Sequence, residues 1–434
     1  MKHRTGASPG LFNPLVLDWV SPKCHTLMKP PSGNGAGDSC DALPCDSFAG
    51  NLSNRAGVAM AAFSSFVDLL TEIEDPRRAE GKLYRLPHVV LFAILAIVAG
   101  ANSYRTIHSF IDVHLARLRD AFGVKWRKAP AYTTIRGILR QLDPASVEAA
   151  FRRHAAVLND ATNGGSQRHV AIDGKTLRRS FDNFLDRRAA HILSAFASDS
   201  ALVLAHLDCD EKSNEIPAVQ SLLGSLALTD SVVTVDAMHC QKKHFEQAAA
   251  TGVHLIAQVK ANQPALHHAI AALCDIAAPL DSTQTADKKR RCRDETRTVE
   301  VFAPGDSLAD TEWDGHIRAV IRVNRDVLTR SATTGLWRDT SETALFVSDV
   351  VLPAAQCAKA IRDHWHIENR SHYVRDGSFA EDASRIRRNP GIFARLRSFA
   401  ANILRFNGIH NVSDGRHRIA FGGINAILGM RIMY

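Results

Sequence analysis

The sequence predicts an α/β fold in which an all-helical N-terminal domain precedes a mixed β-sheet that carries a β-rich insertion. Two changes of pattern along the chain predict this. Apolar residues recur at helical spacing over 61–160, and from Arg168 onward short apolar strands alternate with helices. The predicted order in the second region is β-β-β-α-β-α-β, and strand-like runs then fill an insertion at about 266–350.

Residues 1–60 are predicted to be a disordered extension, because Pro, Gly, Ser and Asn cluster there and no apolar period persists. Met60 stands directly before the first helix, so we expect the working protein to begin near Met60 and the extension to lie upstream of the true start. In the helical domain, 61–160, Asp143 is the expected N-cap of a helix and Pro144 its first residue. Helices are expected at 63–73, 91–98, 104–121, 133–141 and 144–158.

The second domain is assigned to 161–410, and 411–434 to a C-terminal tail. A three-strand meander comes first, and helix-connected parallel strands follow it. Such strands place their carboxyl ends on one edge of the sheet, where the sites of open α/β proteins collect. Strands are expected at 169–172, 190–197, 202–207, 232–235 and 253–259, and helical periodicity returns from Ala354 to about Phe406.

The composition indicates a globular protein with a polyanionic partner. Hydrophobic residues make up 45% and charged residues 23% of the chain, and the net charge is +8, which favours nucleic acid as a partner. The longest apolar run, Val89–Ala101, is shorter than the ~18–20 residues that cross a bilayer, so we expect a cytoplasmic protein without a membrane partner. The cysteines form no Cys-x-x-Cys pair, so a zinc ribbon is not expected.

Two aspartates stand at the predicted strand ends. Asp173 follows the first strand and Asp236 the fourth. If these strands are neighbours, the two carboxylates converge, and they repel each other unless a divalent cation lies between them. Oxygen-only ligands favour Mg²⁺ or Mn²⁺. Taken singly, each aspartate is more typical of an ordinary strand end in a turn.

A third carboxylate is expected from the C-terminal helices. Ile361, Trp365 and Glu368 stand at i, i+4 and i+7, so a helix that packs Ile361 and Trp365 on the sheet also directs Glu368 toward it. The competing acids in this region, which the sequence leaves open, are Asp376, Glu381 and Asp382.

These residues lie in segments that resemble the H-repeat-associated type of bacterial insertion-sequence DDE transposase. The segments are Ala171–Arg178, Lys212–Ile216, Thr234–Gln241 and His364–Asn369. Further matches are Asp75–Arg77 and Ala99–Ala101 in the associated N-terminal domain, Lys260–Gln263, and Phe379–Asp382 with Arg385. The resemblance implies that the helical domain, 61–160, is a DNA-binding domain that recognises or clamps DNA. The resemblance covers about 61–410, in order and at suitable spacing.

The resemblance implies a ribonuclease-H-like core in which Asp173, Asp236 and Glu368 are the catalytic acids and the metal ligands. It implies two Mg²⁺ or Mn²⁺ ions about 3.5–4 Å apart and no organic cofactor. The implied activity is hydrolysis at the end of an insertion element, followed by transfer of the exposed 3′-OH to target DNA. The expected partner is double-stranded DNA, both element ends and target, bound by a homodimer in the bacterial cytoplasm and at the nucleoid when acting.

Basic and amide side chains near the predicted active edge are expected to contact DNA phosphates. These are Lys175, Arg178, Lys260, Asn262, Gln263, Arg385 and Arg388. Supporting positions around the carboxylates are assigned to His239, Asn369, His372 and Asp376.

Two other functions stay open at this point. His366, Tyr373, Arg375 and Gly377 differ from the residues usual in the family, so a catalytically impaired or domesticated relic that only binds DNA is one alternative. A structure-specific nuclease on the same fold is the other. The intact set of three acids favours the transposase.

Overall fold

The computed structural model describes residues 63–162, 169–181, 188–209, 215–226, 228–287, 293–331 and 333–432. All of these residues belong to one compact unit. The predicted disordered extension over 1–60 and the expected start at Met60 lie outside the described residues.

The N-terminal region is all-helical, as expected. Ser146 N–H donates to Asp143 Oδ2 at 2.8 Å, so Asp143 caps the helix that Pro144 begins. The single helix expected over 104–121 is divided at His114, which ends one helix and precedes the next. The helices are 63–71, α2 (Leu86–Val98), α3 (Tyr104–Val113), α4 (Leu115–Phe122), α5 (Tyr132–Gln141) and α6 (Pro144–Thr162), with a short 3₁₀ turn η2 (Ala79–Gly81) before α2.

Helix α2 forms the centre of the N-terminal core, since every one of its residues is buried. Within Ala79–Val98, a run of 18 residues with a mean hydropathy of 1.6 is long and apolar enough to cross a membrane, but 72% of that run is buried inside the protein, as in a core helix. Helix α2 packs against α12 (Pro390–Phe406) and α13 (Val412–Leu428), so the apolar core of the N-terminal helices continues into the C-terminal helices.

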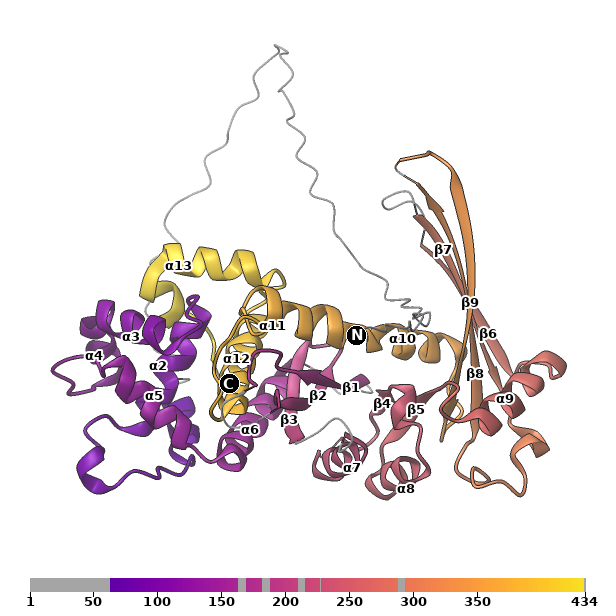
Figure 1. Ribbon diagram of the computed structural model, residues 1–434, viewed down its shortest axis with the longest axis horizontal. Helices are drawn as coiled ribbons and strands as arrows, with labels where there is room; N and C mark the ends of the chain where they lie inside the picture. Colours follow the sequence, from indigo (N-terminus) through magenta and orange to yellow (C-terminus); the bar gives the residue numbers. More distant parts are fainter. Residues whose placement is uncertain are drawn as a thin grey trace, which may run out of the picture. The chain divides into compact units, whose positions relative to one another are not determined.

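The strands of the described chain form one nine-stranded mixed sheet in the order β3-β2-β1-β4-β5-β9-β8-β7-β6 (Figure 1). Strands β1, β2 and β3 are an antiparallel meander, and β4 and β5 run parallel to β1. Together with helices α7 and α8 they give the predicted β-β-β-α-β-α-β order, so the core is ribonuclease-H-like. Their bounds are β1 (His169–Thr176), β2 (His191–Ala197), β3 (Leu202–Cys209), α7 (Glu215–Ser225), β4 (Val232–Val235), α8 (Lys242–Thr251) and β5 (His254–Val259).

The alternation of side chains along the strands separates the two faces of the sheet. Val170 and Ile172 of β1, with Val233 and Val235 of β4, pack with α7, α8 and α9 (Pro264–Ile276) in one apolar cluster. On the opposite face, Ala171 and other residues of β1–β3 pack under α12, and β4 and β5 pack under α10 (Ala354–His364). Asp173 and Asp236 continue the second face, so their carboxylates are directed to the side where α10 lies.

The β-rich insertion extends the same sheet. Strand β9 pairs antiparallel with β5, and β8, β7 and β6 follow it outward as long strands (Figure 1). The expected start at about 266 is wrong, because residues 264–276 form α9 and the first strand begins at Asp281. The sequence does not predict strand β6, since its residues are polar and almost all exposed. The strands are β6 (Asp281–Asp287), β7 (Arg293–Phe302), β8 (Ala319–Arg330) and β9 (Trp337–Ser348).

The helical region expected from Ala354 to about Phe406 is divided into several helices. Helix α10 is followed by a π-helical segment, η6 (Ile367–His372), and by α11 (Tyr373–Gly377), and α12 begins after Asn389. The residues assigned to a C-terminal tail contain α13. In α12, the buried Arg395 pairs with Glu148 of α6 at 2.7 Å and with Asp208 of β3 at 3.0 Å, which ties the helical region to the sheet.

Candidate active site

Asp173 and Asp236 occupy equivalent positions, each one residue beyond the parallel pairing of β1 with β4. That pairing runs from His169 opposite Val232 to Ile172 opposite Val235. The expectation that Asp173 ends its strand is wrong, because β1 continues to Thr176 by antiparallel pairing with β2. What ends at Asp173 is the pairing with β4, so the two aspartates still stand side by side at one edge.

Glu368 reaches the same pocket from the C-terminal helices. It lies in the π-helical segment η6, where the Tyr373 N–H donates to the Glu368 carbonyl five residues back. Such wide helical turns are rare and recur at functional sites. Asp173, Asp236 and Glu368 line one pocket together with Thr234, Val235, Ile256, Gln258, Phe346, Ile361, His364 and Trp365.

The sequence pattern directs Glu368 correctly but places Trp365 wrongly. Ile361 is half-buried, whereas Trp365 is 57% exposed and lines the pocket instead of packing on the sheet. Helix α10 ends at His364, so Trp365 is the residue that directly follows this helix.

The competing acids do not line this pocket. The Lys175 ammonium lies 2.6 Å from Asp376 Oδ2 and 3.8 Å from Asp382 Oδ1. Glu381 is buried and pairs with Arg375 at 3.0 Å and Arg397 at 3.6 Å. Each of these acids is therefore engaged with a basic partner, unlike the acids of the pocket.

The carboxylates of the pocket disfavour one another's charge. Burial, followed by the charge of Asp236, raises the pKa of Asp173 to about 6, and Glu368 contributes in the same direction. Burial and then Asp236 also raise the pKa of Glu368. Uncompensated negative charge thus collects at this edge of the sheet.

Two histidines approach the aspartates without supplying a compensating charge. His372 Nδ1 lies 3.4 Å from Asp173 Oδ2, and burial, with Arg375 and Lys175 nearby, lowers the pKa of His372 to about 3. His364 Nε2 lies 3.9 Å from Asp236 Oδ1, while its Nδ1 hydrogen bonds with Thr234 Oγ1 at 2.8 Å. Burial lowers the pKa of His364 as well. Of the supporting residues expected here, His372 therefore lies beside a carboxylate.

The donor set fits a hard divalent cation. The pocket offers carboxylate oxygens, which Mg²⁺ and Mn²⁺ prefer, and burial together with the charge of Asp236 raises the pKa of two of its acids. Within the described ranges, no three His, Cys, Asp or Glu side chains form a closed metal-binding group. The carboxylates therefore converge on the pocket without closing to ligand distance.

The loop that carries Asp236 is held by two amides that the sequence assigns to DNA contacts. Asn262 Nδ2 donates to the Ala237 carbonyl at 2.7 Å, and Gln263 Nε2 donates to the Cys240 carbonyl at 3.0 Å. These contacts span the short 3₁₀ turn η4 (Ala237–His239) directly after Asp236. Their amide nitrogens are thus used inside the protein, and both side chains brace the Asp236 loop.

The other predicted DNA contacts lie in different settings. Lys175 is buried in its pair with Asp376, so it braces α11 against β1, whereas Arg178 is 81% exposed and only 3.4 Å from Asp382. Lys260 is exposed, and so are Arg385 and Arg388 in the loop before α12. Asn369, expected to support the carboxylates, lines a separate hollow with Arg370 and Tyr373.

A buried glutamate at the start of α7, Glu215, lies beside the site and contacts two histidines from other elements. Glu215, 3% exposed, pairs with His191 of β2 and lies 3.6 Å from His239 Nε2 of the Asp236 loop. A Cβ on Gly174, the residue after Asp173, would lie 2.9 Å from Glu215 Oε1, so a larger residue there would have to displace the Glu215 and His191 side chains. Sequence spacing gives no signal for this cluster, because its members come from three separate elements.

Replacing Glu215 by Gln is expected to lower the free energy of unfolding by about 3 kcal/mol at pH 7. His191 and His239 hydrogen bond with Glu215 and lower its pKa from 4.5 to about 2, against the effect of burial. Because the folded-state pKa is depressed, this stability is present above about pH 4.5 and lost as the pH falls toward 2. Urea unfolding of both proteins between pH 7 and 3 should show the difference shrinking.

The matched control is Glu246→Gln, in an exposed pair with Lys242, which should change stability by less than about 0.5 kcal/mol. A difference between wild type and Glu215→Gln that stays constant with pH would contradict the ion-pair role of Glu215.

Comparison with known proteins gives matches over both regions of the chain. Residues 67–155 match the family model described as DDE_Tnp_1-associated, and residues 164–403 match the model described as Transposase DDE domain. The "H repeat-associated putative transposase YhhI" of Escherichia coli (strain K12) is 32% identical over 340 residues, covering 76% of this chain and 88% of that protein. The "Putative transposase YncI" of Escherichia coli O157:H7 is 30% identical over 355 residues, covering 79% and 88%.

Among solved structures, the piggyBac transposase synaptic complex with hairpin DNA aligns with 86% of this chain and 80% of that chain, at a TM-score of 0.37 and 10% identity. That similarity is too low for a comparison of sites residue by residue.

Proposed function

This chain belongs to the DDE transposase family, and on that premise we propose that it cuts the ends of its own insertion element and joins them to target DNA. The reaction is divalent-metal-dependent phosphodiester hydrolysis followed by strand transfer. The observation that carries the proposal is the convergence of Asp173, Asp236 and Glu368, from two strands and a π-helical turn, on one pocket. The cleavage and joining reaction takes place in the bacterial cytoplasm, at the nucleoid when the protein is bound to DNA.

In this proposal the three carboxylates hold the cations, Mg²⁺ or Mn²⁺, for which two ions are expected. Bound there, they supply Lewis-acid chemistry that activates the attacking oxygen and stabilises the leaving 3′ oxygen. Asp173 must be deprotonated to act as a ligand, and its raised pKa, about 6, makes metal affinity fall as the pH drops below that value. His372 orients the Asp173 carboxylate, and Asn262 and Gln263 hold the Asp236 loop in register with β1.

DNA reaches the acids across exposed basic side chains. Arg178 and Lys260 follow β1 and β5, the strands on either side of β4 at the Asp173–Asp236 edge, and both are exposed. They contact backbone phosphates, which positions the duplex without reading its sequence. Because both ends of an element have to be joined together, the protein acts as a homodimer on DNA.

The test is cleavage of a duplex copied from the DNA that flanks the gene at the element's end, with Mg²⁺ or Mn²⁺ supplied. We expect nicking at the end by the wild type and none by Asp173→Asn, Asp236→Asn or Glu368→Gln, while DNA binding persists in all. Binding without cleavage by the wild type would instead identify a DNA-binding relic. Normal cleavage by Glu368→Gln would remove Glu368 from the proposed site.

A further inference from the structure

We call the pocket lined by Asp173, Asp236 and Glu368 the acid pocket. A separate hollow, lined by arginines, lies between helices α3 and α5 and the loop before α12. We call the arginine hollow the two adjoining depressions whose walls carry Arg105, Arg136, Arg140, Arg385 and Arg388. They share Arg136 and Arg140, so they form one continuous surface. None of its residues lines the acid pocket.

The charge of the arginine hollow is not balanced by the protein. No Asp or Glu lines either depression, and in the described part of the chain none of the five arginines has a carboxylate partner. Arg105 lies instead over the Tyr132 ring, 4.9 Å from its centroid. Among the described residues, these five positive charges therefore have no carboxylate that balances them.

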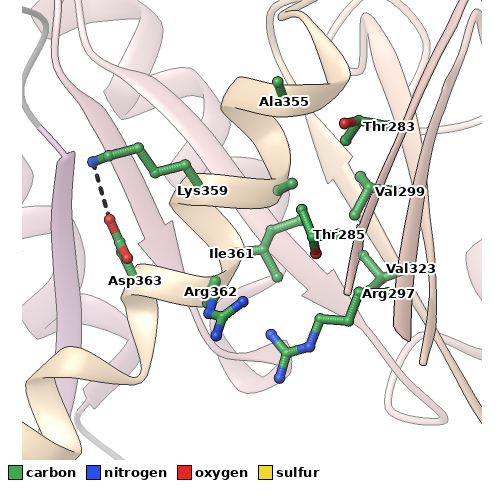
Figure 2. A pocket seen from close by; sticks show the side chains of 11 residues that line it. Thr283, Thr285, Arg297, Val299, Val323, Ala355, Lys359, Ile361, Arg362 and Asp363 are labelled. Carbon is green, nitrogen blue, oxygen red and sulfur yellow. Dashed lines mark ion pairs between the residues drawn. The ribbon is translucent and has the colours of Figure 1, made fainter. Parts of the chain in front are cut away.

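A second hollow, between α10 and the insertion strands, also carries basic side chains, but these are paired with carboxylates (Figure 2). Its walls carry Lys359, Arg297 and Arg362 among apolar residues. Lys359 lies 3.0 Å from Asp363, the pair marked in Figure 2, and Arg297 lies 2.5 Å from Glu295. Arg362 pairs with Asp287. That hollow thus leaves no cation for a ligand, in contrast to the arginine hollow.

Within the described chain, the arginine hollow also has a hydrogen-bond donor without a partner and further basic residues close by. Arg140 Nε is buried and has no hydrogen-bond partner among the described residues. Tyr104, which lines the hollow, packs edge-on against Phe393 at 5.7 Å, and the buried Arg397 lies over the same Phe393 ring. Among the described residues, the buried Arg397 and Arg375 both pair with the same carboxylate, Glu381. The surroundings therefore add positive charge and do not remove it.

We propose that the arginine hollow binds consecutive phosphates of one DNA strand and anchors the duplex whose scissile bond enters the acid pocket. The choice of DNA as the anion rests on the proposed function. Guanidinium groups suit this ligand because their planar forks hydrogen bond phosphate oxygens in pairs. The five arginines come from two helices and one loop, so together they offer several guanidinium groups to a single strand.

The loop before α12 connects this anchor to the acid pocket. Its Asp382 pairs with Lys175, two residues after Asp173, and also with Arg178. Arg385 and Arg388, three and six residues further on, lie in the wall of the arginine hollow. DNA bound in the arginine hollow would therefore contact the same loop whose Asp382 braces β1 next to Asp173.

The test measures binding of a random-sequence duplex without divalent metal, by fluorescence anisotropy over a range of salt concentrations. Such binding needs neither the element's end sequence nor cleavage. The variants are Arg105→Gln/Arg136→Gln on the helices and Arg385→Gln/Arg388→Gln on the facing loop, all at exposed positions. The matched control is Arg418→Gln, an 80% exposed arginine already paired with Asp414.

Removing one arginine–phosphate interaction should reduce the slope of log K against log salt by about 0.9 and weaken binding about five-fold at ~0.15 M salt. Each double variant removes two such interactions, so we expect twice that reduction in slope and a correspondingly larger loss of affinity, with an unchanged thermal midpoint. The control should match the wild type. Slopes and affinities equal to the wild type in both double variants would overturn the proposal. So would a reduced affinity for inorganic phosphate with unchanged affinity for the duplex, which would identify a small-anion site.

The outcomes separate this inference from the proposed function. A protein that cleaves element ends while both double variants keep the wild-type salt slope refutes the arginine hollow alone. A protein that does not cleave but shows a reduced slope in both double variants refutes the catalytic assignment and leaves the DNA-binding surface standing.

Discussion

Asp173→Asn is expected to abolish cleavage and at the same time to stabilise the metal-free protein. Removal of a metal ligand should lower the cleavage rate by more than about 100-fold, since loss of an outer hydrogen-bonding partner alone costs about 10–100-fold. The stability gain follows from the pKa of Asp173, which burial and Asp236 raise from 3.8 to about 6. At pH 7 the charged form is therefore disfavoured by up to about 3 kcal/mol, and Asn removes that penalty.

The stability gain of Asp173→Asn is expected to depend on pH. A carboxyl group with a raised folded-state pKa destabilises the fold above about pH 6 and has no such effect below about pH 4. The difference in free energy of unfolding between Asp173→Asn and wild type should therefore shrink as the pH is lowered from 7 to 4. Addition of Mg²⁺ should raise the thermal midpoint of the wild type and leave that of the variant nearly unchanged. A variant less stable than the wild type at pH 7 without metal would contradict the electrostatic account of the pocket.

Glu381→Gln is expected to cause the largest loss of stability. Glu381 is the one carboxylate between Arg375 and Arg397, at 3.0 and 3.6 Å, and all three side chains are buried. Its loss removes the carboxylate that pairs with both guanidinium groups in the interior. Breaking a buried pair in this way costs about 3–5 kcal/mol. Urea unfolding of wild type and variant at pH 7 measures it.

A suitable control is Glu342→Gln, because Glu342 is 69% exposed and pairs with Arg325 at 3.3 Å. That substitution should change the free energy of unfolding by less than about 0.5 kcal/mol. Equal effects of the two substitutions would mean that Glu381 does not hold the buried arginines together. Glu381→Gln also bears on the third acid, since a stable, fully active variant would exclude Glu381 from the chemistry.

The core of the fold is predictable from the sequence because local patterns determine it. Short, continuous runs of mostly apolar residues in 169–172 and 232–235 identify β1 and β4, and their pairing brings Asp173 and Asp236 together. The helical stripe through Ile361 directs Glu368 toward the same pocket. These features depend on side-chain periodicity within a few residues, which a sequence shows directly.

The features that the sequence does not predict depend on contacts between distant segments. Strand β6 is polar and is a strand because β7 pairs with it, so no apolar alternation marks it. The sequence assigns Asn262 and Gln263 to DNA, because nothing local indicates that their amides meet the carbonyls of the Asp236 loop. Lys175 is likewise buried by Asp376, which lies far along the chain.

The arginine hollow shows the same limit. Arg105, Arg136 and Arg140 lie in helices that precede the sheet, whereas Arg385 and Arg388 follow it. Their common wall arises only because α12 packs against α2 and α5. Arginines that are far apart in the sequence therefore form one positively charged surface only in the folded protein.

The most direct test of the central claim is the location of bound manganese by anomalous diffraction from crystals of the protein soaked with Mn²⁺. The account predicts anomalous peaks in the pocket lined by Asp173, Asp236 and Glu368, and their loss in Glu368→Gln or Asp173→Asn crystals. Peaks at Glu215 with His191 and His239, or at Asp376 and Asp382, with none in the pocket, would contradict it.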